Sequence, residues 1–151
     1  MLWPEGTKRI TSDLIKKYLV SNKLLVAVVE NPDSTQQVVG CLKVERDQKA
    51  KKPSLNVSLL AVKSEWFGHK IGWNLMAKAS QFAEEQNYQF LSGEVLFPYE
   101  DALKESRNRL LNWYLSMGFI VKGRIPFEQL YPEKAKGLAT PCYLQGIQKK
   151  I

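Results

Sequence analysis

The stretch LLAVKSEWFGHKIGWNLM, residues 59–76, decides the fold of this chain. Its apolar beginning predicts a strand that ends at Val62, and its second half predicts a helix that opens near Ile71. N–H groups in the first turn of a helix have no partner within the helix, and the helix dipole adds partial positive charge there. Gly68 and Gly72 leave room for an incoming group and allow unusual backbone angles. This order of elements predicts an anion site, and an ordinary strand-to-helix connection is the alternative.

A second informative stretch, ESRNRLLNWYLSMGFIVKGRIPFE, covers residues 105–128. Its apolar spacing predicts an amphipathic helix from Ser106 to Met117, and Gly118 is placed to be the left-handed residue that follows the helix. The phenol of Tyr114 is a neutral donor at pH 7, so it could supply a proton to a leaving group. The alternative is that Tyr114 is a core aromatic.

Together the two stretches resemble motifs A and B of the GNAT superfamily of N-acetyltransferases. Leu-Ala-Val followed by a loop and Gly-x-x-Ile-Gly is similar to motif A, and Tyr-x-x-x-Gly-Phe is similar to motif B. The resemblance implies that the loop binds the pyrophosphate of acetyl-CoA and that the later helix flanks the pantetheine arm. Tyr114 would then protonate the departing CoA thiolate. The implied cofactor-binding residues are Leu60, Ala61, Val62, Phe67, Gly68, His69, Lys70, Ile71 and Gly72, with Arg107 and Leu110 from an Arg-x-x-Leu pattern of one subgroup.

Two positions of the loop depart from the family. Phe67 stands where Arg or Gln is usual, and Lys70 stands where Gly is usual. Both changes keep the backbone N–H donors of the loop. They remove one side-chain contact to the cofactor and some flexibility of the loop. His69, the only histidine of the chain, could contact phosphate, act as a base or lie on the surface.

The resemblance also implies direct attack of an amine on the thioester, with backbone groups of Leu60 to Val62 polarising the carbonyl. The amine must first lose a proton, and Glu94 on a predicted strand is the candidate base. An outward-facing strand carboxylate is the alternative for Glu94. Ser58 and Asn56 could instead hold a water that relays the proton.

The hydrophobic pattern of the whole chain predicts a single α/β domain over residues 1–151, with a mixed sheet and helices on both faces. We expect the N-terminal strand and helix of the family to be shortened, with the first strand either absent or reduced to Met1–Pro4. We also expect residues 126–140 to be irregular. The predicted helices span residues 12–20, 71–86 and 106–117, and the predicted strands span residues 24–29, 38–46, 55–62, 88–97, 119–125 and 142–148.

Composition excludes several classes of protein. With 22 basic and 15 acidic residues the net charge is +7, but the charges form no single block, so nucleic-acid binding is not the favoured function. Two cysteines and one histidine are too few for a structural zinc site, and no metal is expected. No apolar stretch reaches the roughly 20 residues of a membrane span, and no signal peptide is evident. We therefore expect a cytoplasmic or nuclear protein with two free thiols.

Three functions remain at this point. The favoured one is an enzyme that transfers acetyl from acetyl-CoA to a primary amine of a small molecule or a protein. The second is a degenerate domain that binds acyl-CoA as a sensor or partner module without turnover. The third is a basic nucleic-acid or scaffold protein that uses the net charge. The acceptor amine and the oligomeric state, including a homodimer, stay open.

Overall fold

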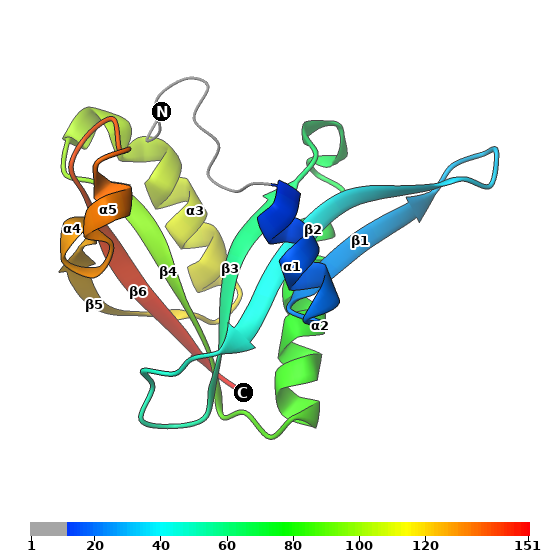
Figure 1. The fold of residues 1–151 in the computed structure, drawn as a ribbon, viewed down its shortest axis with the longest axis horizontal. Coiled ribbons are helices and arrows are strands. Elements are labelled where there is room, and N and C mark those ends of the chain that lie inside the picture. Colours follow the sequence, from blue (N-terminus) through cyan, green and yellow to red (C-terminus); the bar gives the residue numbers. More distant parts are fainter. Residues whose placement is uncertain (1–11) are drawn as a thin grey trace. The chain divides into compact units, whose positions relative to one another are not determined.

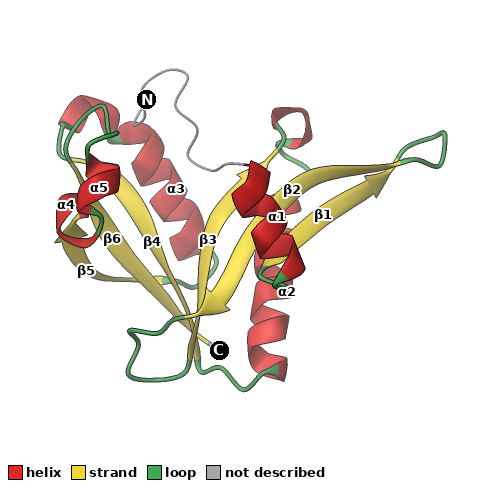
Figure 2. Cartoon of the chain, in the orientation of Figure 1, coloured by secondary structure: helices red, strands yellow, loops and turns green. Residues whose placement is uncertain are grey.

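The computed structural model describes residues 12–151 (Figures 1 and 2), so the expectation for Met1–Pro4 lies outside the described residues. The strands form a mixed sheet with the hydrogen-bonded order β1-β2-β3-β4-β6-β5. In chain order the elements are α1 (Ser12–Val20), β1 (Leu24–Glu30), β2 (Gln36–Arg46), β3 (Ser54–Val62), the 3-10 turn η1 (Ser64–Trp66), α2 (Ile71–Glu85), β4 (Phe90–Pro98), the 3-10 turn η2 (Asp101–Leu103), α3 (Glu105–Ser116), β5 (Ile120–Pro126), α4 (Phe127–Leu130), α5 (Pro132–Ala135) and β6 (Cys142–Lys150).

The mixed α/β class is confirmed, and the predicted helices and strands appear in the predicted order. One expectation was wrong: residues 126–140 are not wholly irregular, because they contain α4 and α5. The physical reason is apolar spacing at helical period. Phe127, Leu130 and Tyr131 pack against buried Cys142 and Leu144, and this tertiary packing stabilises two short helices.

The chain forms two compact units, Ser12–Leu91 together with Ile151, and Ser92–Lys150. The expectation of a single domain stays a prediction. The first unit is built on the antiparallel strands β1, β2 and β3, with α1 and α2 on opposite faces (Figure 1). Lys43 of β2 lies over the Tyr18 ring of α1, whereas Gly40 faces α2. Positions three apart on a strand point to opposite faces, so the two helices cover different faces of β2.

Gly40 allows the start of α2 to lie directly on the sheet. A Cβ at this position would be 2.9 Å from Ile71 Cγ2, 3.0 Å from the Ala61 carbonyl oxygen and 3.3 Å from Leu75 Cδ1. One of these neighbours is backbone, so it cannot simply rotate away. The absence of a side chain at Gly40 therefore sets where the N-terminus of α2 lies.

Gly40→Ala is expected to lower the free energy of unfolding by about 1–3 kcal/mol, because the added methyl overpacks this contact. Urea denaturation followed by circular dichroism measures the change. Gly123→Ala is the matched control, since a Cβ at Gly123 in β5 meets nothing within 4 Å. Equal stability of the two variants would contradict the close approach.

The second unit carries most of β4 together with β6 and β5, and β5 and β6 are antiparallel. Its core includes Phe127, Cys142 and Leu144, which α4, α5 and the following turn cover. Both cysteines of the chain, Cys41 and Cys142, are free thiols, as the sequence predicted. Within residues 12–151 no helix combines the length and apolar character needed to cross a membrane.

Candidate active site

Strand β3 contains an irregularity immediately before the predicted phosphate loop. Lys43 of β2 pairs with Ser58, and Cys41 of β2 pairs with Ala61. Strand β3 therefore places two residues, Leu59 and Leu60, opposite the single β2 residue Leu42. Leu59 has φ of 52°, a left-handed angle that is uncommon for a branched side chain. A bulge of this kind bends the strand and turns backbone groups away from the regular ladder. Sequence reasoning missed it, because Leu gives no signal for a left-handed residue.

The loop from Lys63 to Lys70 is short and mostly exposed. Backbone N–H groups of Trp66 and Phe67 donate to the carbonyls of Lys63 and Ser64 at 2.9 and 3.1 Å, which closes η1. The Trp66 and His69 rings lie 5.0 Å apart, and the Phe67 side chain is 67% exposed. Gly68 has φ of 81°, and a Cβ there would meet nothing within 4 Å. The loop therefore presents backbone and an exposed aromatic ring rather than a buried side-chain cluster.

Helix α2 begins at Ile71, as predicted, with Lys70 as its N-cap. Asn74 N–H donates to the Lys70 carbonyl at 2.9 Å, which is the first bond of the helix. The N–H groups of Ile71 and Gly72 come before that bond, at the positive end of the helix dipole. These donors are the part of the loop that an anion could contact.

The unusual backbone angles of this loop lie at Gly68 and Lys70. The expectation of such an angle was right for Gly68 and wrong for Gly72, which lies inside the first turn of α2. Lys70 has φ of 60° and ψ of 21°, a left-handed conformation that favours glycine. Lys70 stands where the family usually has glycine, and it keeps the glycine-like backbone.

The end of helix α3 explains the spacing of the second motif. Gly118 has φ of 93°, its N–H donates to Leu115 O at 3.0 Å, and Phe119 N–H donates to Tyr114 O at 3.3 Å. These two bonds form the Schellman arrangement, in which glycine is the left-handed residue. The Tyr114 and Phe119 rings meet edge to face at 5.6 Å, and Trp113 lies 5.1 Å from Tyr114. The Gly-Phe pair thus ends the helix and fixes the ring of Tyr114.

The remaining predicted site residues are divided between the two units. Arg107 and Leu110 are half-buried on α3, as is Tyr114. Glu94 is exposed on β4, between buried Gly93 and Val95, as the alternative of an outward-facing carboxylate describes. In the first unit, Leu60 and Val62 are half-buried and Ala61 is exposed at the end of β3. The roles of all these residues stay predictions.

Neither cysteine is a ready nucleophile. Cys41 Sγ lies 3.8 Å from the Leu59 carbonyl oxygen, across from the bulge. Burial raises the pKa of the Cys41 thiol, and burial also raises the pKa of the Cys142 thiol. A thiol with a raised pKa is protonated at neutral pH and reacts poorly. Within residues 12–151, no group of three or more histidine, cysteine, aspartate and glutamate side chains could hold a metal ion.

Comparison with known proteins identifies the family. The family model described as an acetyltransferase (GNAT) domain matches residues 21–121, which is most of the chain. The chain therefore belongs to the GNAT acetyltransferase family, as the two motifs indicated. A search of curated proteins finds no match.

Solved structures share the fold at low sequence identity. A chain of the NatC complex bound to Gag peptide and CoA has 18% identity and a TM-score of 0.64, covering 99% of this chain and 86% of that one. An aminoglycoside 6'-N-acetyltransferase with coenzyme A has 13% identity and a TM-score of 0.65, covering 98% and 83%. A ribosomal-protein-alanine N-acetyltransferase from Brucella melitensis has 20% identity and a TM-score of 0.60, covering 95% and 81%.

Proposed function

We propose that this chain transfers an acetyl group from acetyl-CoA to a primary amine of a small molecule or a protein. The observation that carries the proposal is the entry to α2, where the N–H groups of Ile71 and Gly72 stand at a helix start after an open, glycine-containing loop. Such a start binds phosphate oxygens without a dedicated side chain. Membership of the acetyltransferase family and CoA in two of the similar structures support acetyl-CoA as the donor.

In the proposed reaction, Phe67 to Gly72 hold the pyrophosphate while backbone groups of Leu60 to Val62, beyond the bulge, polarise the thioester carbonyl. The neutral amine attacks the carbonyl carbon, a C–N bond forms, and the C–S bond then breaks. Tyr114 donates its phenol proton to the CoA thiolate, and the attacking nitrogen gives up its surplus proton, which returns to the Tyr114 phenolate by way of solvent. The products are then the N-acetyl amine and CoA thiol. Arg107 and Leu110 of α3 flank the pantetheine arm in this proposal.

The amine substrate is an ammonium ion at neutral pH and must lose a proton before it attacks. Glu94 is the proposed base, and its side chain is exposed on β4. A water held by Ser58 and Asn56, which are half-buried on β3, is the alternative route. Raised thiol pKa values at both cysteines support direct attack over an acetyl-cysteine intermediate.

A second candidate function is binding of acyl-CoA without turnover. The observation that favours it is Phe67, which is 67% exposed at a position where the family usually has a polar contact to the cofactor. A nucleic-acid role for the charge is the weakest candidate. A homodimer and a cytoplasmic or nuclear location remain predictions of the sequence.

Calorimetric titration with CoA and acetyl-CoA tests the cofactor, and release of CoA thiol in the presence of an amine panel tests turnover. Binding of both nucleotides with thiol release is the expected result. Failure to bind either nucleotide at millimolar concentration would refute acetyl transfer and the sensor role alike. Binding without thiol release from any amine would favour the sensor role.

A further inference from the structure

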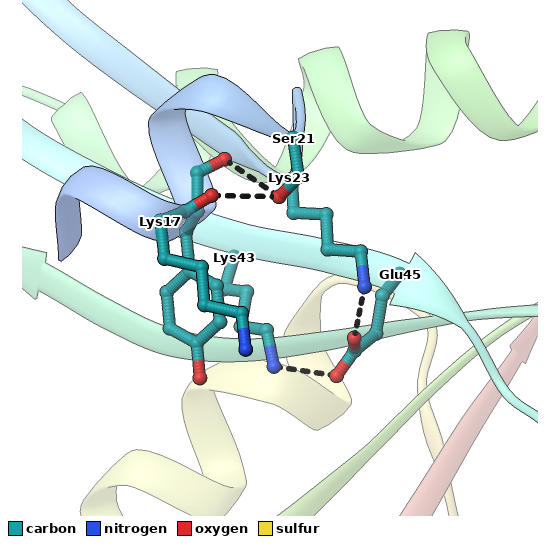
Figure 3. Close-up of polar contacts among 6 residues, drawn as sticks. Lys17, Ser21, Lys23, Lys43 and Glu45 are labelled. Carbon is teal, nitrogen blue, oxygen red and sulfur yellow. Dashed lines mark hydrogen bonds and ion pairs between the residues drawn. The ribbon is translucent and has the colours of Figure 1, made fainter. Parts of the chain in front are cut away.

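A cationic cluster lies where the C-terminal end of α1 meets β2 (Figure 3). Lys43 and Lys23 both form ion pairs with Glu45, and Lys23 Nζ lies 3.3 Å from Glu45 Oε2. Lys43 Nζ also lies 4.3 Å from the centre of the Tyr18 ring, a cation–π contact. Figure 3 shows the Lys17 side chain descending from α1 in the same direction as that of Lys43.

The backbone around this cluster is well fixed. Ser21 Oγ donates to the Lys17 carbonyl at 2.9 Å, and Lys23 N–H donates to the Tyr18 carbonyl at 2.9 Å, which ends α1. Val44 N–H donates to the Lys23 carbonyl at 2.8 Å and ties the segment after α1 to β2. The lysines are therefore presented from anchored backbone rather than from a free loop.

The charges of the cluster do not balance. Among the residues drawn in Figure 3, the ammonium groups of Lys17, Lys23 and Lys43 outnumber the carboxylate of Glu45. Burial raises the pKa of Glu45, but its hydrogen bonds and charge contacts with Lys43 and Lys23 outweigh burial and lower the pKa overall. Glu45 is thus ionised at neutral pH, and the excess charge is positive. The side chain of Lys43 is only 12% exposed, so its ammonium group is largely removed from water.

The position of Lys43 connects the cluster with the candidate active site. Lys43 pairs in register with Ser58 of β3, the residue immediately before the bulge at Leu59. Glu45 pairs with Asn56, so all four side chains share the face of the sheet that α1 covers. Paired strands are about 4.8 Å apart, so a lysine side chain can reach a ligand lying over the neighbouring strand.

We propose that Lys43 and Lys17 select acceptors that carry a carboxylate near the reacting amine, such as a peptide with an acidic first residue. This inference rests on the proposed acetyl transfer. A partly buried ammonium held by Glu45 and Tyr18 offers a charge-assisted hydrogen bond to a carboxylate, while the exposed Lys17 adds attraction. Glu45 holds Lys43 in place in this scheme and does not contact the acceptor.

The test compares two tripeptides that differ only in an N-terminal glutamate or glutamine, with Lys43→Gln, Lys17→Gln and the control Lys51→Gln. Lys51 lies in the exposed loop between β2 and β3. In the parent protein, kcat/KM should favour the glutamate peptide by about 10-fold or more, the size of one charge-assisted hydrogen bond. Lys43→Gln should remove most of this preference through KM, Lys17→Gln should remove part of it, and Lys51→Gln none.

Equal use of both peptides by the parent protein would overturn the inference and leave the proposed function standing. A change in the KM for acetyl-CoA but not for acetyl-dephospho-CoA in Lys43→Gln would also overturn it, because the cluster would then bind the 3′-phosphate of the cofactor. If neither peptide is acetylated, calorimetry measures the affinity of each peptide for the protein in the presence of CoA. Equal affinities for the two peptides would refute the inference. Failure of the parent protein to bind CoA would instead refute the proposed function. If Lys43→Gln does not fold, the exposed Lys17→Gln still gives the comparison.

Discussion

Tyr114→Phe is expected to lower kcat by about 100-fold, within the range of general acid catalysis, and to leave the affinity for acetyl-CoA within about twofold. The substitution removes one hydroxyl and keeps the ring. The edge-to-face contacts of this ring with Phe119 and Trp113 should therefore persist, as should the end of α3. The CoA thiolate would then leave without a proton donor, which slows C–S cleavage but not binding.

Thiol release under saturating acetyl-CoA measures kcat, and calorimetry measures affinity for the cofactor. Tyr88→Phe is the control, because Tyr88 is also half-buried but lies in the turn before β4. A variant with full activity would show that Tyr114 is a core aromatic. Equal loss in both tyrosine variants would point to a general effect on folding, which thermal melting would reveal.

The local features of this fold could be predicted from sequence because they depend on neighbouring residues. Apolar runs and alternating apolar residues located the strands, and the glycine after α3 located its left-handed end, which the φ of 93° at Gly118 confirms. The start of α2 at Ile71 follows the same logic. In these places local preference and tertiary packing agree.

Other features were not predictable because tertiary pairing imposes them. Leu59 and Lys70 both take left-handed angles, although neither residue type favours them. The register between β2 and β3 requires the bulge at Leu59, and the placement of α2 on Gly40 accompanies the turn at Lys70. Sequence alternation shows that Lys43 and Glu45 share a face of β2, but only the fold brings Tyr18 beneath Lys43.

Gly72→Val is expected to weaken binding of acetyl-CoA by at least about 10-fold, because a side chain at the helix start obstructs phosphate oxygens that approach its N–H groups. The loss corresponds to one charge-assisted hydrogen bond or more. Valine favours the helix over glycine, so weaker binding would not arise from loss of α2. Gly123→Val is the matched control, since the site of its Cβ is open.

Acetyl-pantetheine makes this test specific for the phosphate site, because it carries the thioester and the pantetheine arm but no pyrophosphate. If the N-terminus of α2 binds pyrophosphate, Gly72→Val should lower kcat/KM for acetyl-CoA and leave kcat/KM for acetyl-pantetheine unchanged within about twofold, since only the former donor places phosphate there. Equal losses with both donors would instead mean that the valine disturbs the thioester end. Unchanged kinetics with both donors would mean that the phosphates bind elsewhere. The proposal that the N-terminus of α2 binds the pyrophosphate would then be wrong.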